Sequence, residues 1–218
     1  MRRLFLGFAL TSCTLNSGGH EPPRVEVEGV GFMDTEDTDA VEGALRVHVD
    51  EQRYLLSGRT ARDLLVDLSH HRPSDERFTG WTRWRLKWRF EPDVRAGDCR
   101  VAAVDVDLSL TTVLPAWEPP VDANPALVTA WDAYIRALEH HESGHSDLAV
   151  EAAERIHESL SALPASDSCS ALKTLANEVG QAEVRRLRIE NGSFDAHTQH
   201  GARQGAVFPR PEELAGMP

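Results

Sequence analysis

The longest regular pattern in the chain is a hydrophobic stripe that recurs every three or four residues in its second half. Steps of three and four place side chains on one face of an α-helix, so the pattern predicts a long helix with one buried face. The stripe consists of Leu127, Trp131, Tyr134, Leu138, Leu148, Ala152, Ile156 and Leu160. His141 and His145 continue the same face between Leu138 and Leu148, so both imidazoles are predicted to point inward.

Two shorter helices are predicted from capping residues followed by helical spacing. Thr60 is a typical N-cap, and leucines at 64, 65 and 68 predict a short helix over residues 61–70. Cap signals at residues 166–168 precede another helix, which begins at Cys169 and ends near Glu190. Its inward positions are Leu172, Leu175, Val179 and Leu187.

Alternating patterns predict the strands. Residues 80–91 place four apolar side chains opposite four basic ones, and a second alternating strand follows Cys99. The short link over residues 92–98 favours an antiparallel hairpin between them. Residues 47–49 and 54–56 predict two short strands joined by a turn at 50–52. The expected fold class is α+β, a small antiparallel sheet packed against the long helix and a second C-terminal helix.

The strand over residues 80–91 also suggests a binding function. Its apolar side carries Trp84 and Trp88, and its other side carries arginines and a lysine, as in platforms for sugar or nucleic acid. We expect instead that the aromatic side packs beneath the long helix and that the basic side is solvated. A peptidoglycan- or sugar-binding module would require both tryptophans to be exposed.

The N-terminus has the composition of a targeting segment. Arg2 and Arg3 precede a short apolar run over residues 4–10, too short to cross a bilayer. The sequence Leu10-Thr11-Ser12-Cys13 resembles a lipoprotein cleavage site, which implies a signal peptide over 1–12 and a lipid anchor on Cys13. The alternative is a plain secretory signal. Either reading predicts export to the bacterial cell envelope, with the lipoprotein facing the periplasm and touching the membrane only through its anchor.

Composition divides the rest of the chain. Residues 13–43 contain Gly-Gly, Pro-Pro and several acidic residues, which predicts a flexible acidic tether. A single folded domain over 44–205 and a C-terminal tail over 206–218 follow. The net charge of −12 over 218 residues argues against a nucleic-acid partner, because phosphate contacts require clustered cations. Oligomeric state leaves no signal in the sequence.

Cysteine content supports export. If Cys13 carries lipid, Cys99 and Cys169 remain as an even pair in an oxidising compartment, where a disulfide is expected. The alternative is two buried free thiols.

The two inward histidines belong to the motif His141-Glu142-Ser143-Gly144-His145, which has the form H-E-x-x-H. Residues four apart on a helix offer two imidazoles to one cation, and the adjacent carboxylate acts as the general base of zinc hydrolases. The motif therefore predicts a zincin-like fold, with Zn²⁺ at His141 and His145 and Glu142 as base. The alternative is a packed histidine pair without metal. Gly144 is expected to make room for metal, water or substrate.

A catalytic zinc site needs a third protein ligand and an open position for water. The H-x-x-G-x-x-H extension fails here because Leu148 and Glu151 occupy its last two positions. We expect His200 to be the third ligand, because residues 194–201 follow a Gly192-Ser193 break and His200 precedes the small Gly201. Two alternatives in the same segment are Asp195, as ligand or as hydrogen-bond partner of a ligating imidazole, and His197.

The order of these features is specific. A Trp-rich strand, a Cys-led strand ending in L-P-x-W, the H-E-x-x-H helix, a second Cys and a final D-x-x-T-x-H-G follow one another between Ala44 and Gly205. This order resembles the bacterial domain of unknown function 922, whose members are described as predicted secreted zinc-dependent proteases. The resemblance implies a zinc metallopeptidase that hydrolyses peptide bonds of a peptide or protein substrate. The alternative is a non-catalytic envelope protein with structural zinc, for which His140, His197 and Asp195 offer further ligands.

Overall fold

The computed structural model describes residues 28–31, 43–71 and 79–214. The signal peptide, Cys13 and most of the predicted tether lie outside this part of the chain. A strand within the tether range, β1 (Glu28–Gly31), pairs in parallel with the Trp strand. In the described part, no helix is both long and apolar enough to cross a membrane.

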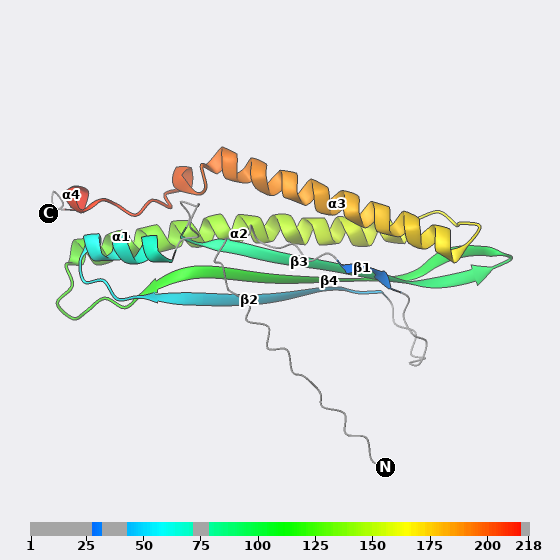
Figure 1. The fold of residues 1–218 in the computed structure, drawn as a ribbon, viewed down its shortest axis with the longest axis horizontal. Helices are drawn as coiled ribbons and strands as arrows, with labels where there is room; N and C mark the ends of the chain where they lie inside the picture. The colour runs from blue at the N-terminus through cyan, green and yellow to red at the C-terminus, as the bar shows by residue number, and fades with distance from the viewer. Residues whose placement is uncertain (1–27, 32–42, 72–78, 215–218) are drawn as a thin grey trace, which may run out of the picture.

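The fold is a mixed four-stranded sheet with two long helices along one side of it (Figure 1). The strand order is β1-β3-β4-β2. The helix α2 (Pro125–Ser161) lies against β3 and β4, and α3 (Cys169–Thr198) runs back along α2 (Figure 1). The predicted α+β class is confirmed.

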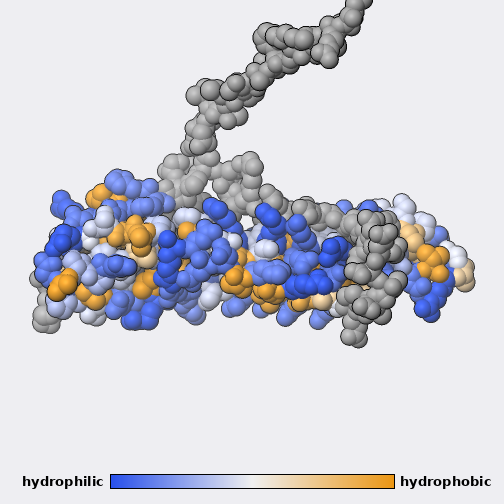
Figure 2. All heavy atoms as spheres, turned by 90° about the horizontal axis from the view of Figure 1, so that it is seen from below, coloured by the Kyte–Doolittle hydropathy of each residue, from blue (hydrophilic) through white to orange (hydrophobic). Residues whose placement is uncertain are grey.

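The predicted hairpin is present, formed by β3 (Trp81–Arg95) and β4 (Asp98–Trp117) in antiparallel register. Its apolar side faces the helices, where Trp84, Leu86, Trp88 and Phe90 are all buried. The tryptophans therefore do not form the exposed platform that a sugar-binding module requires. Figure 2 shows the molecule from the side of the strands, where hydrophilic surface prevails and hydrophobic residues form small separate patches.

One strand, β2 (Leu45–Leu56), replaces the two short strands predicted for this region. It runs parallel to β4 over its whole length, so the sheet is mixed and not purely antiparallel as predicted. Parallel neighbours require a crossover connection, which is supplied here by α1 (Ala61–His70) and β3. The segment 50–52 contains neither Gly nor Pro, and pairing with the long β4 keeps it extended.

The helices α1 and α3 begin at predicted caps, whereas the cap of α2 was not predicted. Thr60 forms a capping box with Asp63 at the start of α1, Asn124 caps α2, and Ser168 caps α3. The end of α3 differs from the prediction, because the helix continues through the Gly192-Ser193 pair to Thr198. Asp195 and His197 consequently lie on a helix, not on a loop. A short 3₁₀ helix, η1 (Ala202–Gln204), and α4 (Pro211–Leu214) follow.

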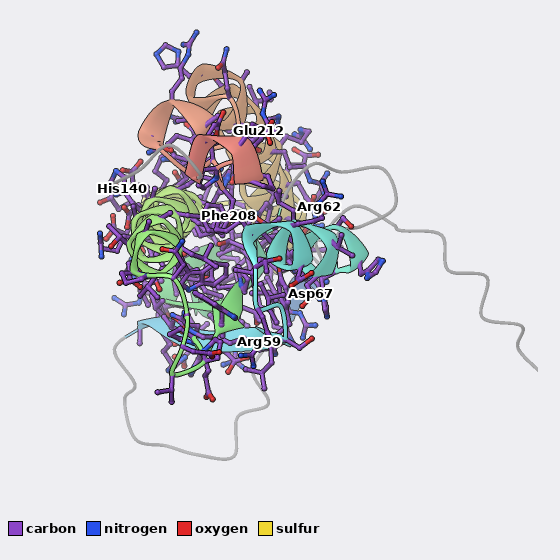
Figure 3. All side chains as sticks on the ribbon, turned by 90° about the vertical axis from the view of Figure 1, so that its left-hand side faces the viewer. Arg59, Arg62, Asp67, His140, Phe208 and Glu212 are labelled. Carbon is purple, nitrogen blue, oxygen red and sulfur yellow. A yellow bond between two sulfur atoms is a disulfide. The ribbon has the colours of Figure 1, made fainter. Side chains whose placement is uncertain are left out.

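Two clusters of buried side chains lie along α2, one on each side of its central turns. The larger cluster includes Trp88, Phe90, Ile156 and Leu187 beneath α3. The smaller cluster contains side chains of α1 and of the first turns of α2, together with Phe208. Figure 3 looks along the molecule from the end where α1 lies and shows Phe208 between α1 and α2. The folded part of the chain thus extends past residue 205, where the tail was expected to begin.

The predicted disulfide joins Cys99, near the start of β4, to Cys169, the first residue of α3. Backbone hydrogen bonds between Cys99 and Ser166, at 2.8 and 2.9 Å, bring the two segments together beside it. The bond therefore fastens the α2–α3 connection to the sheet.

Replacing both cysteines by serine is expected to destabilise the domain by about 4 kcal/mol, because the bond closes a loop of 70 residues. For a domain of this size, that corresponds to a fall of roughly 10 °C in the midpoint of thermal unfolding. Circular dichroism of the wild type and of the Cys99→Ser, Cys169→Ser variant, each with and without reductant, measures the effect. A wild-type midpoint that reductant leaves unchanged would contradict the expectation.

Candidate metal centre

The central turns of α2 present His141 and His145 to α3. The two residues are one helical turn apart, and their ring centroids are 4.9 Å apart. The side chains are 5% and 12% exposed. The helix therefore turns both imidazoles inward, as the sequence predicted.

Asp195 of α3 meets both rings. Its Oδ1 atom lies 3.2 Å from His141 Nε2 and 3.1 Å from His145 Nε2. The three residues offer one ligand atom each within 4.8 Å of one another. Asp195, an alternative in the sequence analysis, is thus the third member of the group, because α3 continues far enough to carry it over the histidines.

The other predicted candidates lie further out. His200 follows α3, and its side chain is 44% exposed, with Nδ1 at 3.4 Å from Asp195 Oδ1. His197 is exposed, and its backbone carbonyl accepts a hydrogen bond from Arg203. His140 is also exposed on α2 (Figure 3). His200 therefore borders the group of three, whereas neither His197 nor His140 belongs to it.

Two amide side chains that the sequence analysis did not single out also contact the histidines. Gln204 Oε1 lies 2.9 Å from His141 Nδ1, and Asn191 Oδ1 lies 2.6 Å from His145 Nδ1. Asn191 is one turn before Asp195 on α3, so extending the helix past Glu190 would have placed both on one face. Gln204 follows the irregular turn after α3, and no periodicity predicts its position.

Gly144 makes room for the side chain of Phe194, a neighbour that the sequence analysis did not anticipate. The ring of Phe194 stacks on His141 with centroids 5.1 Å apart and contacts His145 edge-on at 5.0 Å. A Cβ atom on residue 144 would overlap Phe194 Cζ and lie 2.9 Å from its Cε1. Glycine at this position therefore lets Phe194 hold both imidazoles.

Gly144→Ala is expected to destabilise the domain by about 1–3 kcal/mol, because overpacking against Phe194 outweighs the gain in helix propensity. Gly192→Ala on α3 is the matched control, since a Cβ there meets no atom within 4 Å. That control should stabilise the protein by about 1 kcal/mol. Chemical denaturation of both variants measures the two effects, and a stabilising Gly144→Ala would show that Phe194 moves freely.

The turn after α3 brings its backbone against His141. Gln199, His200 and Gly201 all have left-handed backbone conformations, with φ of 52°, 52° and 79°. The hydroxyl of Thr198 accepts a hydrogen bond from the Gly201 N–H at 3.3 Å. A Cβ on residue 201 would lie 3.0 Å from His141 Cγ, so glycine permits this close approach.

Glu142 lies beside the two histidines on the side of the sheet. The residue is 3% exposed, and Thr82 of β3 donates a hydrogen bond to its Oε2 atom at 2.9 Å. Among the described residues, Oε1 makes no hydrogen bond. Burial raises the pKa of Glu142, against the lowering effects of His145, the Thr82 hydrogen bond and His141.

A model of the family described as "Bacterial protein of unknown function (DUF922)" matches residues 51–201. This chain belongs to that family. The matched range contains the whole H-E-x-x-H motif together with Asp195 and His200, and the resemblance found in the sequence is confirmed. No curated protein and no solved structure matches the chain.

In this DUF922 protein, the contacts between Asp195 and the two histidines favour a negative charge on Asp195 and a positive charge on His145. Burial alone would raise the pKa of Asp195, but hydrogen bonds with His141 and His145 outweigh it and hold that pKa well below its ordinary value. Burial likewise lowers the pKa of His145, but its hydrogen bond with Asp195 and the nearby carboxylates raise it above the ordinary value. The ionised carboxylate of Asp195 therefore attracts a cation or a proton to the space between His141 and His145.

The residues of the DUF922 centre fit a zinc ion. Two imidazole nitrogens and one carboxylate oxygen are ligand types of catalytic zinc sites, which keep a fourth position open. The three ligand atoms converge from two packed helices, and each imidazole has a hydrogen-bond partner on its other nitrogen, as is usual for metal-ligating histidines.

Proposed function

We propose that this protein is a zinc-dependent peptidase of the bacterial cell envelope that hydrolyses peptide bonds in a peptide or protein substrate. The observation that carries the proposal is the convergence of His141, His145 and Asp195 within 4.8 Å, with the buried carboxyl of Glu142 next to them on α2. The H-E-x-x-H arrangement on a helix is typical of zinc metallopeptidases.

The metal would be held by His141 Nε2, His145 Nε2 and a carboxylate oxygen of Asp195. A zinc ion bound there supplies a Lewis acid that activates water at neutral pH and polarises a carbonyl oxygen. Phe194 packs against both rings and limits the access of bulk water to them. Exposure rises from His141 through Asp195, at 28%, to His200, so a substrate would approach from the C-terminal end of α3.

Glu142 performs the proton transfers. Oε1 accepts a proton from the attacking water while Thr82 holds Oε2. The carbonyl carbon gains a hydroxyl group, the C–N bond breaks, and Glu142 delivers the same proton to the departing nitrogen, which leaves as an amine. Burial favours this role, because a carboxylate with few water contacts accepts a proton more readily.

The proposed location rests on the disulfide as well as on the N-terminal sequence. Disulfides persist in oxidising compartments outside the cytosol, and Cys99–Cys169 is such a bond. Export as a lipoprotein anchored through Cys13, facing the periplasm, accounts for all three cysteines.

A structural zinc site is the second candidate, and the position of His200 favours it. His200 Nδ1 lies 3.4 Å from Asp195 Oδ1, within reach of the same group. If His200 became a fourth ligand, the site would be closed and no position would remain for water. The absorption spectrum of the cobalt-substituted protein distinguishes the open catalytic site from the closed structural site. At an open site an added anion such as azide replaces the bound water and changes the spectrum, whereas at a closed site the spectrum stays the same.

The test of the proposed function uses the purified protein without its first twelve residues. We expect one zinc ion per chain by elemental analysis and cleavage of members of a random peptide library. Cleavage should stop when a chelator removes the metal and return when zinc is added. A protein that binds zinc stoichiometrically but cleaves no peptide would support the structural site instead.

A further inference from the structure

We propose that Asn191 and Gln204 are positioning residues that hold the proton of each metal-binding imidazole on Nδ1, so that both Nε2 atoms are presented to the metal. The proposal rests on the metal centre of the proposed function. His141 and His145 each use Nε2 toward Asp195 and Nδ1 toward an amide oxygen. The amides thus act through the histidines and do not touch the metal or the substrate.

The orientation of the Asn191 amide decides which nitrogen of His145 is protonated. Asn191 Nδ2 donates a hydrogen bond to the carbonyl of Leu187 at 2.9 Å, so Oδ1 is the atom that faces His145. An amide oxygen only accepts hydrogen bonds, and therefore His145 Nδ1 must donate. A ring whose Nδ1 proton is held in this way exchanges only its Nε2 proton for a metal ion.

Asn191 is itself held in place by the helix contacts around it. Its neighbour Glu190 accepts hydrogen bonds from Arg155 of α2 and from Arg186 of α3, both at 2.8 Å. Asp195 lies one turn further along the same face of α3. The ion pairs between α2 and α3 therefore hold both Asp195 and the Asn191 amide next to His145.

Gln204 reaches His141 from a different element. The left-handed turn at Gly201 packs on the His141 ring, and η1 then places Gln204 Oε1 at 2.9 Å from Nδ1. Phe194 covers the ring by stacking at 5.1 Å. Backbone, aromatic ring and amide together leave His141 a single orientation.

Both acceptors are neutral, which matters in a group that already contains two carboxylates. A carboxylate partner would raise the basicity of the ligand and add negative charge beside Asp195 and Glu142. An amide fixes the proton without adding charge. The two amides therefore set the direction of the Nε2 lone pairs while leaving the charge of the site to its ligands.

The test compares Asn191→Leu and Gln204→Met with Gln181→Leu, a control that removes an amide from α3 where no described hydrogen bond is lost. Zinc affinity is measured by competition with a chelator, and the proton positions of zinc-loaded, ¹⁵N-histidine-labelled protein by NMR. We expect about 10- to 100-fold weaker zinc binding in each amide variant and wild-type affinity in the control. Asn191→Asp, which keeps an acceptor, should restore the affinity lost in Asn191→Leu.

The NMR spectrum of the wild-type protein should show a proton on Nδ1 of His141 and of His145. This measurement does not depend on whether any variant folds. A proton on Nε2 of either ring, or unchanged zinc affinity in both amide variants, would overturn the proposal. Zinc binding with these properties but without peptide cleavage would refute the proposed function alone. A wild-type protein that takes up no zinc would refute both.

Discussion

Replacing Glu142 by glutamine is expected to lower peptide hydrolysis by about 10²- to 10⁴-fold, the usual contribution of a positioned general base. The amide has the shape of the carboxyl group, so the Thr82 hydrogen bond and the packing around this buried side chain persist. Zinc content and thermal stability should therefore match the wild type. Initial rates on the best peptide of a library, together with elemental analysis, measure both effects.

Glu154→Gln is the matched control, because Glu154 lies on the exposed face of the same helix. It should change neither rate nor metal content. Undiminished hydrolysis by Glu142→Gln would remove Glu142 from the reaction. Loss of zinc from that variant would mean that the carboxylate is itself a ligand, in which case a different base must be sought.

Asp195→Ala is expected to weaken zinc binding by more than about 100-fold, since losing a ligand exceeds the 10- to 100-fold effect of losing its hydrogen-bond partner. His200→Ala should bind zinc nearly as tightly as the wild type, because among the described residues the ligand atoms that lie within 4.8 Å of one another are those of His141, His145 and Asp195. Zinc titration against a chelator measures both affinities.

Asp147→Ala, an exposed carboxylate on α2, controls for the loss of a negative charge near the site. The reverse result, with tight binding kept in Asp195→Ala and lost in His200→Ala, would restore His200 as the third ligand. Loss of tight binding in both variants would indicate the closed four-ligand site and would count against a peptidase.

The sequence predicted the elements whose signal is periodic. The stripe along α2 and the alternation in β3 each repeat a local rule several times, the cap at Ser168 is a single local signal, and the structure has a helix or strand at each of them. Because the histidines belong to the stripe, their inward orientation followed from the same pattern. The disulfide followed from the two cysteines that remain once Cys13 is assigned to the lipid anchor.

The errors arose where packing outweighs local preference. Gly192 and Ser193 are poor helix residues, yet α3 continues through them because Leu187 is buried before them and Phe194 packs on the histidines after them. Ending the helix too early placed Asp195 on a loop and hid its position over the histidines. The purpose of Gly144 was likewise hidden, since its neighbour Phe194 is fifty residues further along the chain.

The parallel pairing of β2 with β4 has a consequence for the order of folding. β3 and β4 are joined by a tight turn and can pair locally, whereas β2 pairs with residues 61 positions further along the chain, as Leu45 does with Val106. Closing so long a loop costs entropy before any contact compensates for it. We therefore expect β2 to dock after the hairpin has formed, leaving the edge of β4 open to pairing with other chains during the interval. A chain that folds in this order would depend on chaperones more than its final stability suggests.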